Sequence, residues 1–236
     1  MSEDTLHDLN FFPKERGMLV FGISLSRISN SQSAQHYFEF LEHLDKKIQQ
    51  TEGIGATFLY ADYLYMLTDE GTGAELRAKY VAQMSQHKNQ LLSLLKKDPA
   101  WVRNYFTFIT HGQVLLNAST TLPAYLEKIL EFYNTDDELK KCVVLDSGTG
   151  SPSTEQAHFI LEESLLFYLA SKGVISYPNP FINHREEWVL HCYPGKPLAT
   201  ETYLYQKNLF KLDNPKNRYE NSFYDLEEKK LYNFNR

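Results

Sequence analysis

The stretch that most constrains this chain is Met18-Leu-Val-Phe-Gly-Ile-Ser24. A short apolar run of this kind is typical of a strand that is buried on both faces. When such a strand ends in Gly-x-Ser, it places a hydroxyl at the carboxyl edge of a parallel sheet, where open α/β folds bind their ligands. We therefore predict a strand over 18–24 and consider Ser24 a candidate nucleophile. A turn or helix-capping role for Ser24 is the alternative, because such strand ends occur in folds with unrelated functions.

Composition narrows the class of protein. The 236 residues suffice for one large domain, and 42% hydrophobic with 23% charged residues is typical of a soluble globular protein. The net charge of -6 means that any RNA contact must come from a local basic patch. Cys142 and Cys192 have no metal-ligand spacing, so neither a zinc site nor a disulfide framework is expected. No apolar run approaches the roughly 20 residues of a membrane span, and we expect a cytoplasmic protein.

Hydrophobic periodicity predicts alternating strands and helices. After the first strand, the predicted helices cover 33–50, 74–97, 122–133, 136–146 and 154–170, and the predicted strands cover 56–61, 104–109 and 187–193. Residues 1–17 are interpreted as a polar lead-in, 146–152 and 173–185 as loops, and the remainder after 193 as closing the sheet with another helix. A strand-helix-strand order favours parallel pairing with a right-handed crossover. With no repeat or linker, the chain is predicted to form a single α/β domain over 1–236.

The segment Phe159-Ile-Leu-Glu-Glu163 is a second candidate for chemistry. Phe159 and Glu163 are four residues apart and therefore neighbours on one helix face. Leucines flank Glu163, and a carboxylate that packs against apolar side chains has a raised pKa, in a range useful for proton transfer. The alternative is that Glu162 and Glu163 simply face water, which is the usual fate of such a pair.

The third candidate is Tyr193-Pro194, at the end of the last predicted strand. The proline stops the strand, so the phenol of Tyr193 is expected at the edge of the sheet. A phenol can donate or relay a proton there, and a packed aromatic residue is the alternative interpretation.

Other familiar site patterns are missing from the sequence. It contains neither a Gly-x-x-x-x-Gly-Lys-Ser/Thr phosphate loop nor a Gly-x-Gly-x-x-Gly dinucleotide motif, so ATP and NAD are not implied. His184 and His191 are not at metal-ligand spacing. We therefore expect no metal and no cofactor.

Taken together and in this order, the three segments resemble the motifs of the cyclodipeptide synthases. The first motif of that family is His-x-two aliphatics-Gly-aliphatic-Ser; the chain keeps Gly-Ile-Ser and departs from the pattern at Met18 and Phe21. The second motif is Tyr-aliphatic-x-x-Glu-x-Pro; the chain keeps Glu163, with Phe159 in place of tyrosine and Leu165 in place of proline.

The third motif points to a subgroup. Tyr193-Pro194 resembles the third motif of the Tyr-Pro subgroup. Members of that subgroup have no fixed asparagine three residues after the motif serine. Arg27 stands at that position, as the subgroup pattern implies.

The resemblance implies an activity and a fold. Cyclodipeptide synthases join the amino acids of two aminoacyl-tRNAs into a cyclic dipeptide, a diketopiperazine of secondary metabolism, without ATP. Their Rossmann-like, three-layer fold has a mostly parallel central sheet flanked by helices and resembles the catalytic domain of class I tRNA synthetases. The partners implied are two aminoacyl-tRNAs, with no cofactor, no metal and no membrane, and we expect a monomer.

The resemblance also implies roles for individual residues. Ser24 would form an aminoacyl-enzyme, Glu163 would hold the substrate ammonium group and take its proton, and Tyr193 would relay a proton near Ser24. The substrate-binding residues implied are Val20, Gly22, Leu59, Asp146, Phe159 and Pro194. The tRNA would bind to the helix at 74–97, through Arg77, Lys79, Lys88, Lys96 and Lys97.

Two rival functions stay open. A serine hydrolase would need a histidine base near Ser24, and its candidates are His36, His111 and His191. The other rival is a non-catalytic protein of the same fold that binds aminoacyl-tRNA or a small molecule. This alternative stays open because Phe159 lacks the tyrosine hydroxyl that, by the resemblance, touches the substrate amino group.

Overall fold

The computed structural model describes residues 4–5, 17–48, 54–62, 71–97, 105–178 and 188–234. Within these residues one sheet has the strand order β1-β7-β6-β5-β2-β3-β4. Its strands are β1 (Asp4–Thr5), β2 (Gly17–Ile23), β3 (Ile54–Tyr60), β4 (Tyr105–Thr110), β5 (Trp188–Tyr193), β6 (Ser222–Asp225) and β7 (Lys230–Asn233). The pairs from β4 through β3, β2 and β5 to β6 are parallel, whereas β7 pairs antiparallel with both β6 and β1.

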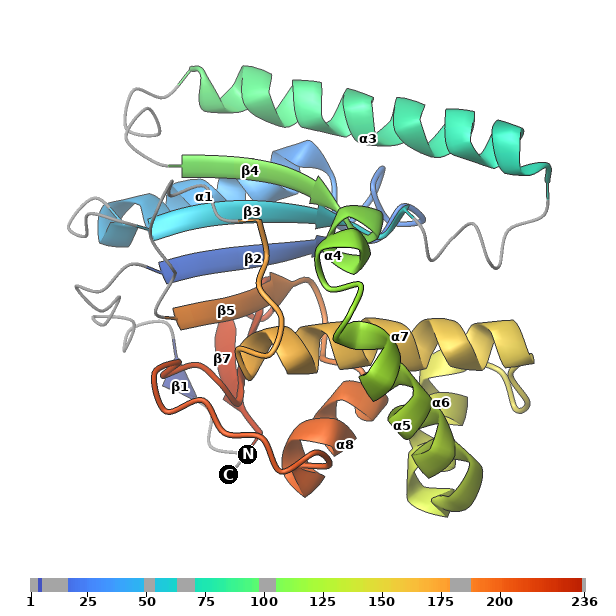
Figure 1. Cartoon of the computed structure of the whole chain (residues 1–236). Coiled ribbons are helices and arrows are strands. Elements are labelled where there is room, and N and C mark those ends of the chain that lie inside the picture. The colour runs from blue at the N-terminus through green and yellow to red at the C-terminus, as the bar shows by residue number, and fades with distance from the viewer. Residues whose placement is uncertain are drawn as a thin grey trace.

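Helices cover both faces of this sheet (Figure 1). They are α1 (Ala34–Ile48), α3 (Gly73–Leu95), α4 (His111–Asn117), α5 (Leu122–Thr135), α6 (Asp137–Ser147), α7 (Thr154–Ser171) and α8 (Ala199–Lys207). One hydrophobic core joins the sheet to α1 and α3, and a second core joins its other face to α4–α8. The predicted three-layer α/β fold with a mostly parallel sheet is therefore confirmed.

The two cores explain the apolar run in β2. Leu19, Phe21 and Ile23 belong to the core beneath α1 and α3, whereas Met18 and Val20 belong to the core on the other face. Because successive side chains of a strand point to opposite faces, a strand between two helical layers needs apolar residues at every position. The central place of β2 in the sheet follows from this pattern.

Helix α7 begins as its sequence predicts. The Ser153 hydroxyl accepts a hydrogen bond from the Gln156 N–H at 3.2 Å, and the Gln156 side chain accepts one from the Ser153 N–H at 3.0 Å. This reciprocal capping box satisfies two N–H groups at the helix start. Most of α7 is then buried, and Glu162 is only 8% exposed. The alternative in which Glu162 faces water is therefore wrong, because α7 lies within the core of the fold.

Several details differ from the sequence predictions. The remainder after 193 forms α8 and also the β6–β7 hairpin, whose four-residue strands are too short to give a clear periodic signal. Helix α4 was not predicted, and α6 ends at Ser147, so the loop predicted over 146–152 begins after that residue. In the predicted lead-in 1–17, Asp4–Thr5 forms an edge strand and Gly17 begins β2. The rest of that lead-in, and residues 179–185 of the loop at 173–185, lie outside the described residues.

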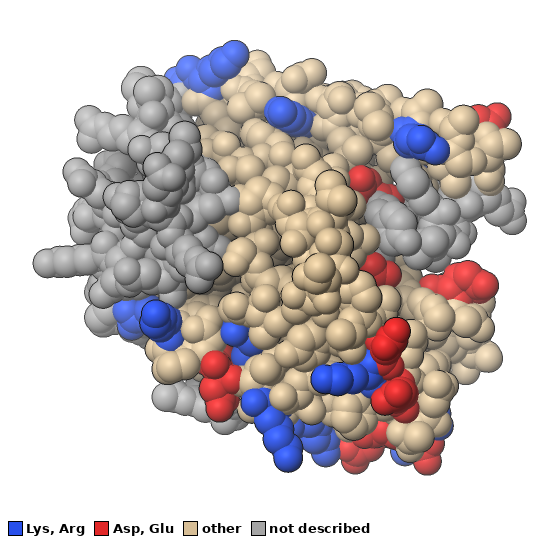
Figure 2. Space-filling view, viewed as in Figure 1, with Lys and Arg blue, Asp and Glu red and all other residues tan. Residues whose placement is uncertain are grey.

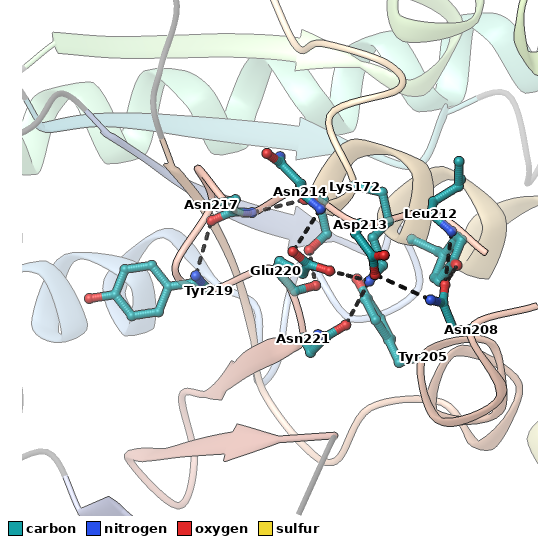
Figure 3. A network of polar contacts seen from close by, with 12 residues as sticks. Lys172, Tyr205, Asn208, Leu212, Asp213, Asn214, Asn217, Tyr219, Glu220 and Asn221 are labelled. Carbon is teal, nitrogen blue, oxygen red and sulfur yellow. Dashed lines mark hydrogen bonds and ion pairs between the residues drawn. The ribbon is translucent and has the colours of Figure 1, made fainter. Parts of the chain in front are cut away.

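A buried ion pair joins the end of α7 to the segment before β6 (Figure 3). The Lys172 ammonium lies 2.5 Å from Glu220 Oε1, and the two side chains are 2% and 13% exposed. Lys172 also donates to Asn221 Oδ1 at 2.9 Å, and the second oxygen of Glu220 accepts from the Asn214 N–H at 2.8 Å. These contacts hold the segment that precedes β6 against the C-terminal end of α7.

We expect Lys172→Met to lower the free energy of unfolding by about 3 kcal/mol, because it leaves the Glu220 carboxylate buried without its cation. Urea denaturation monitored by circular dichroism measures this change. Lys140→Met is the control, because the Lys140–Asp137 pair is 40% and 86% exposed and its loss should leave the midpoint unchanged. Equal stability of the Lys172→Met and wild-type proteins would contradict a stabilising role for the Lys172–Glu220 ion pair.

Candidate active site

The candidate site lies where β2 and β5 end. Ser24 directly follows β2, and Tyr193 is the last residue of β5. These strands are parallel neighbours in which Phe21 lies opposite Cys192, so Ser24 and Tyr193 reach the same edge of the sheet. From β2, the sheet extends to β3 and β4 on one side and to β5 and β6 on the other. Open α/β sheets bind ligands at such a switch point, at the carboxyl ends of the strands.

A cavity of about 210 Å³ opens at this edge of the sheet. Ser24, Glu163 and Tyr193 all line it, although they come from a strand end, a helix and a second strand end. The residues predicted to bind substrate that also line it are Gly22, Asp146 and Phe159. The structure thus brings these six residues together, while their chemical roles stay predictions.

A much smaller cavity of about 10 Å³, with room for about one water molecule, adjoins the first. Gly22, Glu163 and Leu59 line it, together with the buried His111. Val20 and Pro194 line neither cavity. Val20 lies one strand repeat before Gly22 and is fully buried in the core, which explains why it does not reach the cavity.

Hydrogen bonds on both sides fix the position of Ser24. Its N–H donates to Gln32 Oε1 at 2.5 Å, its Oγ lies 2.9 Å from Ser26 Oγ, and the Gly22 carbonyl accepts from Tyr37 at 2.8 Å. Gln32 also lines the cavity. Sequence reasoning missed this contact, because nothing in the Ser- and Asn-rich segment distinguishes Gln32 as a partner of Ser24.

The histidine candidates do not form a triad with Ser24. None of the described residues that line the larger cavity is a histidine. His36 hydrogen-bonds to Ser33 at 2.8 Å, and His191 is buried against Tyr177 at 2.9 Å. Burial also lowers the pKa of His111, which lines the smaller cavity, to about 4. This arrangement disfavours the serine hydrolase alternative.

Glu163 lies on the face of α7 that borders the cavity, one turn from both Phe159 and Phe167. Burial raises the pKa of its carboxyl to about 7, while nearby Arg27 lowers it and Asp146 raises it. A carboxyl with this pKa is divided between its acid and base forms near neutral pH, which is the condition for efficient proton transfer. The sequence prediction of a raised pKa at Glu163 agrees with this geometry.

Tyr193 has a partner that the sequence did not indicate. Its hydroxyl donates to Glu201 Oε2 at 2.8 Å, and its ring stacks on Phe167 at 6.0 Å between centroids. Glu201 is 1% exposed, and burial raises its pKa to about 8, with a further increase from Glu163. Burial also raises the pKa of the Tyr193 phenol, which therefore stays protonated and able to donate. Glu201 is eight residues from Tyr193 on a different element, so neither strand nor helix periodicity links the two in the sequence.

Asp146 faces the cavity and also caps a helix. Its two carboxylate oxygens accept hydrogen bonds from the N–H groups of Ala199, at 2.8 Å, and Thr200, at 2.7 Å, at the start of α8. A carboxylate at a helix N-terminus is stabilised by the unpaired N–H groups and by the helix dipole. The position of Asp146 in the cavity wall is therefore fixed.

The predicted tRNA-binding residues lie along α3 and just beyond its end. Arg77, Lys79 and Lys88 are exposed on the helix, and Lys96 and Lys97 are exposed after its last residue. Figure 2 shows basic side chains over α3 separated by uncharged surface. The positive charge is therefore spread along the helix rather than gathered in one patch.

The described parts of the chain contain neither a candidate metal site nor a membrane-spanning helix. No group of three or more His, Cys, Asp and Glu side chains there could hold a metal ion. None of the helices there has the length and apolar character needed to cross a membrane.

Comparison with known proteins identifies solved structures with the same fold. No protein-family model matches the sequence, and no curated protein matches it. A cyclodipeptide synthase from Fluoribacter dumoffii aligns with a TM-score of 0.58 and 13% identity, covering 89% of this chain and 90% of that one. One from Staphylococcus haemolyticus aligns with a TM-score of 0.55 and 14% identity, covering 91% and 94%.

A third solved structure is the cyclodipeptide synthase from Candidatus Glomeribacter gigasporarum bound to Phe-tRNAPhe. It aligns with a TM-score of 0.55 and 14% identity, covering 90% of this chain and 91% of that one. The chain therefore shares the fold of these three cyclodipeptide synthases over about 90% of its length.

Proposed function

We propose that this protein is a tRNA-dependent cyclodipeptide synthase. One observation carries the proposal: Ser24, Glu163 and Tyr193, which match the family's motif positions, line one cavity at the carboxyl edge of the sheet. The shared fold supports it, and so does the structure of a synthase bound to Phe-tRNAPhe. Tyr193-Pro194 and Arg27 favour the Tyr-Pro subgroup.

In the first step, Ser24 Oγ attacks the ester carbon of an aminoacyl-tRNA. The Oγ–C bond forms, the bond from carbon to the ribose oxygen breaks, and the Oγ proton passes to the departing ribose hydroxyl through the Tyr193 phenol. An aminoacyl ester is already activated, so transfer to a positioned hydroxyl needs no ATP. The product is an aminoacyl-serine intermediate.

In the second step, the amine of another aminoacyl-tRNA attacks this intermediate. A C–N bond forms, the C–Oγ bond breaks, and Ser24 regains its proton. The free amine of the dipeptidyl-tRNA then attacks its own ester, which closes the ring and releases the tRNA. Glu163 takes the proton from the ammonium group, and Asp146 helps to hold that group, because both carboxyls border the cavity.

Other parts of the cavity fit the same function. Gly22 lines the larger cavity with Ser24, where the first amino-acid side chain would lie, whereas Leu59 lines only the smaller one. The enzyme would work in the cytoplasm as a monomer, with two aminoacyl-tRNAs as its substrates and no cofactor. A non-catalytic protein that binds aminoacyl-tRNA is the second candidate, favoured by Phe159, which lines the cavity without a hydroxyl.

We expect the wild-type protein, incubated with charged tRNAs, to form diketopiperazines that mass spectrometry detects. Ser24→Ala should form neither product nor a covalent aminoacyl-enzyme, because no other group replaces the attacking oxygen. Ser29→Ala is the matched control, since Ser29 is an exposed serine of the same segment. Full product from Ser24→Ala would remove Ser24 from its role, and binding of aminoacyl-tRNA without product would favour the non-catalytic alternative.

We expect the rate of the second step to rise with pH up to about 7 and then level off. Only the ionised form of Glu163 can accept the ammonium proton, and the pKa of this carboxyl is raised to about 7. Glu163→Gln should lose this dependence and slow consumption of the aminoacyl-enzyme by about 100-fold or more, because the amide is no base. Rapid-quench measurement of the two steps separates them, and an unchanged pH profile in Glu163→Gln would contradict the assignment.

We expect Lys79→Glu combined with Lys88→Glu to weaken tRNA binding and to reduce the slope of log affinity against log salt by about 2. The reason is the loss of two phosphate contacts on α3. Filter binding at several salt concentrations measures the slope. Lys140→Glu, on α6 at the other face of the sheet, is the control. An unchanged slope in the double variant would place the tRNA elsewhere.

A further inference from the structure

The N–H group of Ser24 is already occupied. In serine proteases, the N–H of the nucleophilic serine is one of the two donors that stabilise the oxyanion of the tetrahedral intermediate. Here this N–H donates to Gln32 Oε1 at 2.5 Å. Another donor must therefore face the negative charge that develops when Ser24 attacks an ester carbon.

The same hydrogen bond fixes the orientation of the Gln32 amide. A backbone N–H can only donate, so the side-chain atom that faces it must be the oxygen Oε1. The NH₂ group of Gln32 then points away from the Ser24 N–H. Gln32 lines the cavity, and the hydrogen bonds of the described residues do not use its Nε2. The side chain thus offers N–H donors in the cavity beside the nucleophile.

The backbone of Gln32 is held as firmly as its side chain. Its N–H donates to the Arg27 carbonyl at 3.1 Å, and its carbonyl accepts from His87 Nε2 at 3.1 Å. Burial lowers the pKa of His87 to about 4, so this ring is neutral, with Nε2 protonated and Nδ1 accepting from Tyr60 at 2.9 Å. Gln32 itself is 4% exposed. A donor held in place before the reaction begins is what electrostatic stabilisation of an oxyanion requires.

Other donors that line the cavity fit this task less well. The Tyr193 hydroxyl donates to Glu201 at 2.8 Å, and the Ser26 hydroxyl lies 2.9 Å from Ser24 Oγ. The Arg27 side chain is exposed and lowers the pKa of Glu163, so its charge already acts on that carboxylate. Gln32 therefore combines burial, a fixed orientation and free N–H donors.

We propose that Gln32 is a catalytic residue whose side-chain NH₂ donates to the oxyanion formed when Ser24 attacks an aminoacyl ester. This inference rests on the proposed function and adds to it a residue outside the motifs that the resemblance identifies. His87 acts as a positioning residue, because it holds the carbonyl of Gln32 from α3.

Two substitutions separate donation from positioning. Gln32→Glu keeps an acceptor for the Ser24 N–H but has no N–H to donate, whereas Gln32→Met is uncharged and has neither. We expect both variants to lower the rate of Ser24 acylation by about 100-fold, the typical effect of removing one oxyanion donor. The affinity for tRNA should stay unchanged, and circular dichroism should show both variants folded, with a melting temperature lowered by the lost acceptor or the buried carboxyl. Gln35→Glu and Gln35→Met, at an exposed position of α1, are the matched controls.

Acylation is measured with two reagents, aminoacyl-tRNA and the p-nitrophenyl ester of alanine, by rapid quench and by the burst of p-nitrophenol. A wild-type rate in Gln32→Glu would overturn the proposal, because positioning alone would then suffice. A wild-type acylation rate in Gln32→Met would also overturn the proposal, because a slow rate in Gln32→Glu would then result from the added negative charge and not from the loss of an N–H donor. If the p-nitrophenyl ester acylates the wild-type protein and aminoacyl-tRNA does not, the synthase function is wrong. The acylation rates of the Gln32 variants with the p-nitrophenyl ester then test the role of Gln32 by themselves. If neither reagent acylates Ser24, both proposals fall.

Discussion

The parallel pairing of β2 with both β3 and β5 is the constraint on which the rest of the structure depends. It requires β2 to be apolar at successive positions, and it carries Ser24 and Tyr193 to the same edge of the sheet. A shift of one residue in β2 would exchange its two faces. Gly22 would then no longer lie against Phe167 and Tyr193, which an added Cβ would meet at 3.4 Å and 3.7 Å. The cavity is thus a product of strand register as much as of side-chain identity.

The charges around the cavity suit the proposed substrates. Glu163 and Asp146 line the cavity, Glu201 accepts a hydrogen bond from the Tyr193 hydroxyl beside it, and burial raises the pKa of both glutamates. An acidic wall favours the ammonium group of an aminoacyl ester, whereas the basic side chains lie on α3, over the other core of the protein. A protein with a net negative charge can therefore bind an aminoacyl-tRNA, provided that the aminoacyl ammonium group meets the acidic cavity and the tRNA phosphates meet the basic side chains of α3.

The sequence predicted those parts of the fold and site that depend on local patterns. The apolar run of β2, the start of α7 at Thr154 and the position of Glu163 on a helix face follow from spacings of a few residues. The β6–β7 hairpin was missed because strands of four residues carry too little periodicity. Gln32 and Glu201 could not be found from the sequence, because each acts on a residue eight positions away through a turn that the sequence does not specify.

The double engagement of Asp146 changes what a substitution there would mean. Both of its oxygens bind the first N–H groups of α8, and α8 carries Glu201, which holds the Tyr193 hydroxyl. Loss of the carboxylate would therefore release a helix end and, through it, the orientation of a phenol across the cavity. If Asp146 also holds the substrate ammonium group, as proposed, an inactive Asp146 variant would combine a lost ligand with a displaced helix, and substrate recognition would be mechanically linked to the alignment of the reacting groups.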